Sequence, residues 1–330
     1  MPKRRRVADP EVEEQREDLQ MDAPSTITRS DIWFRDGNMI LQTEGTQFKV
    51  HQGFLEKHSS VFADMFSFPQ PEGDGESNSV EGCHVVQIYD APEDIELLLL
   101  ALYDQHHHTQ GRIPFKTISA MIRMGKKYGI QHLRDEGAQL LANEFPKTLE
   151  EFGKTSLETW TYIVPEVGLL PKVVALAHQC DIPTILPAVY FRSLRNMDTL
   201  LYGDLLSDGT GRSETLPDRV LRACLAGNEQ IIAGLGSTFS WLDEAYMCML
   251  QCFDIGRDVK VALWTGRPKA YRALCTWKQL ASEFGELNKL CSECLISSQK
   301  QLDSERKETW EKLPSYFGLP EWKDMKDFSL

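Results

Sequence analysis

The sequence predicts an α+β protein in which a small sheet covered by helices is followed by an all-α region. Apolar and polar residues alternate between Asp31 and Val50, as in half-buried strands. From Phe54 to Phe66 the apolar spacing changes to three and four residues, which is typical of short amphipathic helices. After Phe145-Pro146 no strand pattern is convincing, so the remainder of the chain is predicted to be helical.

The first two strands are predicted to form a hairpin. Asp36-Gly37-Asn38 can adopt the positive φ angles of a tight turn, and alternating apolar residues flank it. A third short strand is expected at residues 84–89, which read HVVQIY. Between these strands, Ser59 or Ser60 can cap the second short helix, because a serine hydroxyl accepts a hydrogen bond from a free amide of the first turn.

The remaining segments are predicted as helices. Residues 93–103 are too continuously apolar for a surface helix, so a buried helix is expected there. Pro114 opens a pair of helices that carry apolar stripes. The helices predicted beyond residue 145 cover 148–164, 170–180, 183–195, 199–206, 217–253, 259–263, 268–284 and 287–313.

Composition indicates a soluble globular protein with room for two domains. The chain has 330 residues, of which 42% are hydrophobic, and a net charge of -13. Phosphate binding needs a basic field over the whole footprint, so no direct contact with nucleic acid is expected. The longest apolar run is too short to span a membrane, and no signal peptide is visible. Eight cysteines are too few for a disulfide scaffold, which favours a nuclear or cytoplasmic location with reduced thiols.

Residues 1–29 are predicted to be a disordered charged tail. An acidic run follows a basic cluster, and little in the segment can be buried. The basic cluster, Lys3, Arg4, Arg5 and Arg6, is similar to a monopartite nuclear localisation signal. A solvated tail without a signal explains the same residues, so both interpretations stay open.

Several short motifs occur in a fixed order between residues 31 and 145. They are Asp31-Ile32-Trp33-Phe34, Phe48-x-Val50-His51, Leu55, His58-Ser59, Val61-Phe62, Met65-Phe66, Tyr103 and Lys127-Tyr128-Gly129-Ile130. Together they resemble the BTB/POZ domain, and the version seen here is similar to the BTB proteins expanded in mushroom-forming fungi. The resemblance implies a BTB/POZ fold with a small mixed sheet at 30–145. With the charged tail at 1–29 and the strand-free remainder, the chain is predicted to have three parts, the last an all-α domain at 146–330.

The resemblance also implies a protein-interaction function. BTB domains bind protein partners and commonly form homodimers, and many are substrate adaptors that bind the cullin scaffold of a ubiquitin ligase. Two segments depart from the family pattern. Residues 11–29 lack the apolar stripe of a helix that packs on a dimer partner, and Phe68-Pro69-Gln70 stands where cullin binders often have a hydrophobic-x-Glu motif. The residues expected to contact a partner are Asp31, His51, Phe54, Lys57, His58, Phe68 and Pro69.

Asp31 and His51 also have a structural interpretation. A charge beside the buried ends of two strands is unfavourable unless it is paired, so these residues could be a polar pair that fixes the strand ends. In the BTB family, the matching positions lie near one another by the dimer groove. The two interpretations, partner surface and structural pair, stay open.

Two cysteine and histidine groups raise the question of a metal. Cys291 and Cys294, with Cys275 earlier in the chain, have spacing that could suit zinc. However, a helix over 287–313 would place both thiols on the stripe facing the core, where cysteine acts as a small apolar side chain. Residues 106–108, three adjacent histidines, lack partners at ligand spacing and fit a solvated loop. We therefore predict no metal or other cofactor, with the zinc alternative kept.

No enzyme is predicted, because the chain contains no GxSxG, GxxxxGK[ST] or HExxH motif. The sequence leaves three functional hypotheses. The first is a BTB adaptor of a cullin-type ubiquitin ligase. The second is a nuclear, transcription-linked scaffold, and the third is a zinc-dependent protein that uses Cys275, Cys291 and Cys294.

Overall fold

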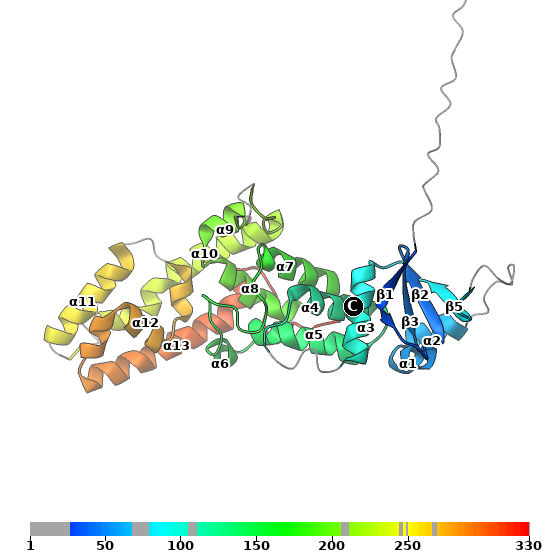
Figure 1. Cartoon of the computed structure of the whole chain (residues 1–330). Coiled ribbons are helices and arrows are strands. Elements are labelled where there is room, and N and C mark those ends of the chain that lie inside the picture. The colour runs from blue at the N-terminus through cyan, green and yellow to red at the C-terminus, as the bar shows by residue number, and fades with distance from the viewer. Residues whose placement is uncertain are drawn as a thin grey trace, which may run out of the picture. The chain divides into compact units, whose positions relative to one another are not determined.

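The structure is a computed structural model that describes residues 27–67, 79–104, 111–205, 211–243, 247–248, 250–265 and 269–329 (Figure 1). The chain divides into two compact units. The first comprises Met1–Gln52 and Glu72–Pro92, and the second comprises Gly53–Pro71 and Glu93–Leu330. The first unit contains the strands and the second contains helices.

The first unit is a mixed sheet in the strand order β1-β3-β2-β5-β4. Two strand pairs are antiparallel, β2 with β3 and β4 with β5. Two are parallel, β1 with β3 and β2 with β5. The strands are β1 (Thr28–Trp33), β2 (Met39–Thr43), β3 (Thr46–Val50), β4 (Ser79–Val80) and β5 (Cys83–Gln87). This confirms the predicted fold class, which included a small mixed sheet.

The predicted hairpin turn at residues 36–38 is wrong. β1 and β2 are not neighbours in the sheet, and the hairpin joins β2 to β3 through Glu44 and Gly45. Both residues have positive φ, 42° and 83°, as a two-residue hairpin turn requires. The role of Gly37 is to allow close packing and not to form a hairpin turn. A Cβ at this position would lie 2.9 Å from the Lys49 Cγ and 3.0 Å from the Val50 carbonyl oxygen.

A second two-residue turn fixes the start of β5. Glu81 and Gly82 have φ angles of 52° and 74°, so the chain reverses between β4 and β5. The strand predicted at 84–89 is β5, which begins one residue earlier, at Cys83, and ends at Gln87.

The second unit contains the helices that belong to the motif region and those that follow it. The first group is α1 (Gln52–His58), α2 (Ser60–Ser67), α3 (Pro92–Tyr103), α4 (Phe115–Lys127) and α5 (Gln131–Glu144). The second group is α6 (Leu149–Phe152), α7 (Leu169–Cys180), η1 (Pro183–Ile185), α8 (Leu186–Ser193), α9 (Met197–Tyr202), α10 (Asp218–Thr238), η2 (Ser240–Leu242), α11 (Leu250–Thr265), η4 (Ala270–Leu274), α12 (Trp277–Glu283), η5 (Gly285–Lys289) and α13 (Ser292–Tyr316).

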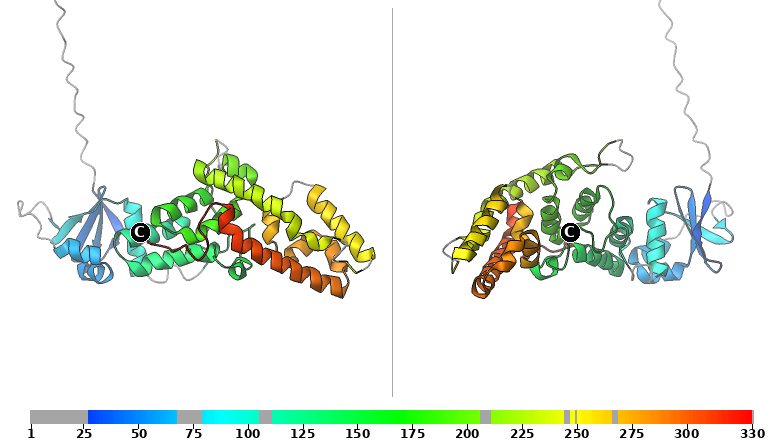
Figure 2. Two further views of the ribbon diagram at one scale, coloured as in Figure 1. Left: turned by 180° about the vertical axis from the view of Figure 1, so that it is seen from behind. Right: turned by 60° about the vertical axis from the view of Figure 1, so that its left-hand side comes forward.

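The helices from α4 onward share one continuous apolar core. Buried residues from Ile113 to Phe317 form a single cluster, to which α4, α7, α8, α10 and α13 all contribute. The long helices α10 and α13 pack side by side in this unit (Figure 2). After α13, Trp322 stacks on Trp310 with ring centroids 5.3 Å apart, so the C-terminal segment folds back onto the helices.

Several of the predicted helices are wrong in extent. The 148–164 helix is reduced to α6. The Glu144 carboxylate accepts hydrogen bonds from the backbone amides of Thr161 and Tyr162, so these amides do not need helical partners. The 217–253 helix is two helices, since α10 ends at Thr238 and α11 begins at Leu250. The 287–313 helix begins late: η5 ends at Lys289 and α13 begins at Ser292.

None of the helices in the described part of the chain combines the length and apolar character that crossing a membrane requires.

Candidate functional site

Helix α1 carries three of the predicted partner-binding residues on one part of the helical unit. Phe54 is half-buried and its ring stacks on Tyr103 of α3, with centroids 4.4 Å apart. His58 lies 4.6 Å from the Phe54 ring and 5.3 Å from the ring of His132 in α5. Lys57 is exposed beside them. We call these five residues, Phe54, Lys57, His58, Tyr103 and His132, the α1–α3–α5 surface.

The imidazole of His58 is held in its neutral form. Its partial burial, followed by the nearby His132 and Lys57, keeps the pKa of His58 below its usual range. At neutral pH this ring is therefore an aromatic, uncharged contact group that can still donate or accept a hydrogen bond. The α1–α3–α5 surface thus combines aromatic rings with the charge of Lys57.

The junction between α1 and α2 explains why these side chains are held in one arrangement. The Ser59 hydroxyl accepts a hydrogen bond from the Phe62 amide at 3.0 Å and donates one to the Tyr128 carbonyl oxygen. The rings of Phe62 and Tyr128 stack almost in parallel, 4.4 Å apart. Ser59, and not Ser60, therefore caps α2, and the cap also ties the α1–α2 pair to the end of α4.

In the first unit, His51 pairs with a residue that the sequence did not identify. Its Nε2 lies 3.3 Å from a carboxylate oxygen of Asp36, at the end of β3, and its ring contacts Phe34. The backbone of Asp36 and the bond to His51 hold the pKa of this carboxyl below its usual range. Asp31 is exposed on β1, so its charge avoids the desolvation cost that suggested a buried pair with His51.

The other predicted functional residues lie outside the described part of the chain. These are Phe68 and Pro69 of the predicted partner surface and Lys3, Arg4, Arg5 and Arg6 of the predicted localisation signal. The histidines at 106–108 are outside it as well. For these residues the sequence-based interpretations remain predictions.

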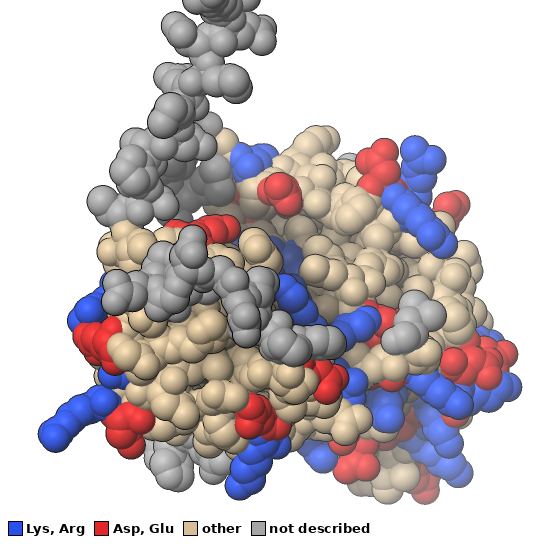
Figure 3. All heavy atoms as spheres, turned by 90° about the vertical axis from the view of Figure 1, so that its right-hand side faces the viewer, with Lys and Arg blue, Asp and Glu red and all other residues tan. Residues whose placement is uncertain are grey.

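Charged side chains of opposite sign lie among one another on the face seen in Figure 3. Several are paired within one unit. Arg123 of α4 binds both carboxylate oxygens of Asp94 in α3, at 2.8 and 2.7 Å. On the sheet, Arg29 lies 2.8 Å from Glu81. Local pairing of this kind compensates the charge of these basic side chains.

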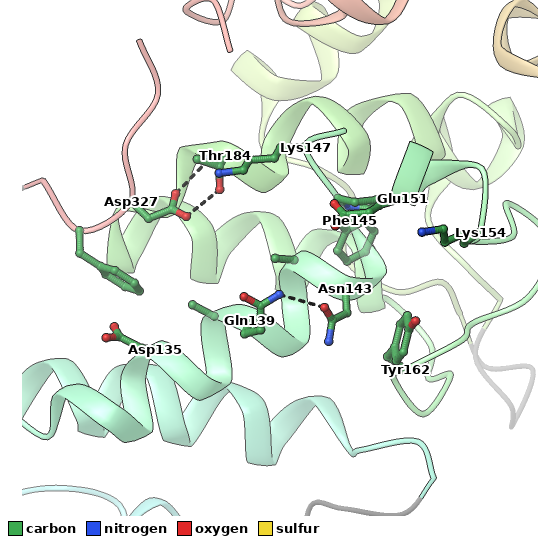
Figure 4. Close-up of a pocket in the computed structure, with 14 residues that line it drawn as sticks. Asp135, Gln139, Asn143, Phe145, Lys147, Glu151, Lys154, Tyr162, Thr184 and Asp327 are labelled. Atoms are coloured by element: carbon green, nitrogen blue, oxygen red, sulfur yellow. Dashed lines mark hydrogen bonds between the residues drawn. The ribbon is translucent and has the colours of Figure 1, made fainter. Parts of the chain in front are cut away.

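A polar groove of about 570 Å³ lies in the helical unit beside α5 (Figure 4). The Asp327 carboxylate accepts hydrogen bonds from the backbone and hydroxyl of Thr184, at 3.1 and 2.6 Å. Gln139 donates to Asn143 at 2.9 Å, and Arg134 lies over the ring of Phe328. These groups hold the C-terminal residues in the groove, so we assign its polar lining a structural role.

Four cysteines converge at a different part of the helical unit. The sulfur atoms of Cys248, Cys252, Cys291 and Cys294 all lie within 4.8 Å of one another. Cys252 and Cys294 are buried, Cys291 is half-buried and Cys248 is exposed. Cys275 is not among them, and its thiol donates to the Tyr271 carbonyl oxygen. The cysteine triad considered from the sequence is therefore wrong in its membership.

The sequence did not identify two residues of the α1–α3–α5 surface and two residues of the cysteine cluster. Tyr103 and His132 are far from α1 in the sequence, and nothing local links them to Phe54. Cys248 and Cys252 fall within the single helix predicted over 217–253, whereas in the structure α10 ends at Thr238 and α11 begins at Leu250. Their CxxxC spacing, set beside the CxxC of Cys291 and Cys294, was the available signal.

Comparison with known families identifies the N-terminal part of the chain. Residues 35–144 match the family model of the BTB/POZ domain. No curated protein matches the chain. The chain therefore carries an N-terminal BTB/POZ domain, a protein–protein interaction module, followed by a mostly helical region.

Proposed function

We propose that this chain is a substrate adaptor whose BTB domain binds a cullin scaffold of a ubiquitin ligase. The observation that carries the proposal is the α1–α3–α5 surface, which lies within the BTB match of residues 35–144. In this role the helical region after residue 145 presents a second protein. The chain acts by binding alone, in the nucleus or the cytoplasm.

The composition of the α1–α3–α5 surface supports a protein partner. Aromatic side chains supply much of the binding energy at protein interfaces when a partner covers them. Phe54 stacks on Tyr103 and makes a tilted contact with His58, and all three rings are only partly buried, so their exposed edges are already fixed in position. Rings that are fixed before binding lose little conformational entropy when a partner covers them.

Lys57 gives the surface a charge that a partner can recognise. Its side chain is exposed at the C-terminal end of α1, beside the aromatic rings. A charge at the rim of an interface contributes more to the rate and specificity of association than to the affinity. An acidic group on the scaffold would complement it.

The proposal is tested by binding of the full-length chain to the immobilised N-terminal domain of a cullin. Replacement of two exposed residues of the surface by acidic ones, Lys57→Glu with His132→Asp, is expected to weaken retention about tenfold, since each change adds a negative charge that opposes an acidic partner. Lys116→Glu is the matched control, because Lys116 is exposed on α4 of the same unit and outside the surface. Its retention should equal that of the unaltered chain.

Two results would remove the adaptor function. One is no retention of the unaltered chain at micromolar concentration. The other is equal weakening by Lys116→Glu and by the double variant, which would place the contact elsewhere. Circular dichroism melting curves of all three proteins establish that the variants are folded.

A further inference from the structure

The four-cysteine cluster has the composition and spacing of a structural zinc centre. Its members form two short pairs: Cys248 and Cys252 are separated by three residues, and Cys291 and Cys294 by two. Paired ligands separated by two to four residues, with a longer connection between the pairs, are typical of protein zinc sites. Four cysteine ligands complete a tetrahedral shell and leave no position open for a substrate.

The distances between the sulfur atoms agree with such a centre. A zinc–sulfur distance of about 2.3 Å in a tetrahedron places the sulfurs about 3.8 Å apart. In the structure the Cys248 and Cys291 sulfurs are 3.2 Å apart, and no pair in the cluster exceeds 4.8 Å. Small rotations about the side-chain bonds would bring all four atoms to the required spacing.

The helices around the cluster favour the thiolate form that binds zinc. Cys252 is the third residue of α11, and Cys294 is the third residue of α13. Cys248 and Cys291 lie just before the same two helices. Two helix N-termini therefore converge on the sulfur atoms, and the positive end of each helix dipole stabilises negative charge.

Backbone amides point at the sulfur atoms directly. The amide of Cys248 donates to the Cys294 sulfur at 3.3 Å, and the amide of Cys291 donates to the Cys252 sulfur at 3.5 Å. The amide of Cys294 donates to the Cys291 sulfur at 3.5 Å. Hydrogen bonds from outside the ligand shell orient metal ligands and stabilise their charge, so these amides form the support that a thiolate centre needs.

We propose that Cys248, Cys252, Cys291 and Cys294 bind one structural zinc ion, which holds the start of α11 to the start of α13. Each ligand pair belongs to one of these helices, so the ion joins two segments that are about forty residues apart in the chain. The ion would stabilise this part of the helical region by joining α11 to α13.

A disulfide is the competing explanation for two of the four thiols. It would join Cys248 to Cys291, the closest pair, and leave the buried sulfurs of Cys252 and Cys294 unused although they lie in the same cluster. The chain's other described cysteines, Cys83, Cys180, Cys224 and Cys275, are buried and belong to no such group. The convergence of all four thiols is explained by a metal and not by one disulfide.

The test uses the full-length chain purified under reducing conditions without a chelator. Elemental analysis is expected to give one zinc per chain. Cys291→Ser and Cys248→Ser should each reduce the zinc content to less than half, whereas Cys275→Ser should retain it, because Cys275 lies outside the cluster. Replacement of the metal by Co²⁺ in the unaltered chain should give the intense visible bands of a tetrahedral thiolate site.

The cobalt spectrum keeps the test decisive if a cysteine variant does not fold, because it requires no substitution. Zinc well below one per chain, together with no tetrahedral cobalt spectrum, would overturn the proposal. So would full zinc retention in both Cys291→Ser and Cys248→Ser, or a Cys248–Cys291 disulfide found by mass spectrometry in the reduced preparation. Loss of zinc from Cys275→Ser alone would also overturn it, in favour of the triad considered from the sequence.

Discussion

At the scale of single residues, the buried pair of Glu144 and Arg192 determines the path of the chain after α5. Glu144 is 2% exposed and Arg192 is 7% exposed, and they are joined at 2.9 Å. The other Glu144 oxygen accepts the amides of Thr161 and Tyr162, and Arg192 lies 3.9 Å over the ring of Trp160. The pair thus holds Thr161 and Tyr162 in a non-helical segment where local spacing predicted a helix.

Removing one partner of this pair should be strongly destabilising. Arg192→Met leaves the Glu144 carboxylate buried without its cation and is expected to cost about 3–5 kcal/mol. Arg222→Met is the control, because Arg222 forms an exposed pair with Asp218 that contributes less than about 1 kcal/mol. Urea unfolding followed by tryptophan fluorescence measures both. Equal midpoints for the two variants would show that Glu144 does not need its partner.

At the scale of elements, α4 and α5 pack so closely that two glycines are required between them. A Cβ on Gly125 would lie 2.7 Å from the Arg134 amide nitrogen. A Cβ on Gly137 would lie 2.8 Å from the Ile122 side chain. Since Arg134 and Ile122 belong to the facing helix in each case, the glycines set the distance between α4 and α5, and α5 carries His132 of the α1–α3–α5 surface.

Alanine at Gly125 should therefore destabilise the protein, although alanine favours helices in general. We expect a cost of about 1–3 kcal/mol from overpacking against Arg134. Gly234→Ala provides the opposite case: no atom lies within 4 Å of its Cβ position in α10, so stability should rise by up to about 1 kcal/mol. Thermal unfolding by circular dichroism compares them. A rise in melting temperature for Gly125→Ala would contradict the close packing.

The elements were predictable where a local signal defined both ends. α7 was predicted to within one residue, and Ser59 was one of two residues proposed as the cap of α2. The prediction failed where distant groups decide the structure. The turn residues Glu44 and Gly45 displaced the hairpin from 36–38. The breaks before α11 and α13 cannot be read from apolar spacing, because apolar and cysteine residues continue the helical spacing across them.

At the scale of the whole molecule, the sequence predicted more about the BTB domain than about the helical region that follows it. The BTB domain was recognised because its motifs recur in a fixed order, and residues 35–144 match that family. The helical region offered no motif that could be matched residue by residue. Its four-cysteine cluster becomes visible only when α11 and α13 are placed together, since the two ligand pairs are far apart in the chain. The boundary near residue 145 stays a prediction.

The most direct test of the central claim is calorimetric titration of the full-length chain with the N-terminal domain of a cullin. If the chain is a cullin adaptor, we expect saturable binding with a Kd of about 10 μM or tighter, which corresponds to about 7 kcal/mol of binding free energy. Burial of the aromatic rings of the α1–α3–α5 surface predicts a negative heat capacity change as well. If no saturable binding heat is measured at concentrations well above that Kd and at two temperatures, the chain does not bind a cullin through this surface.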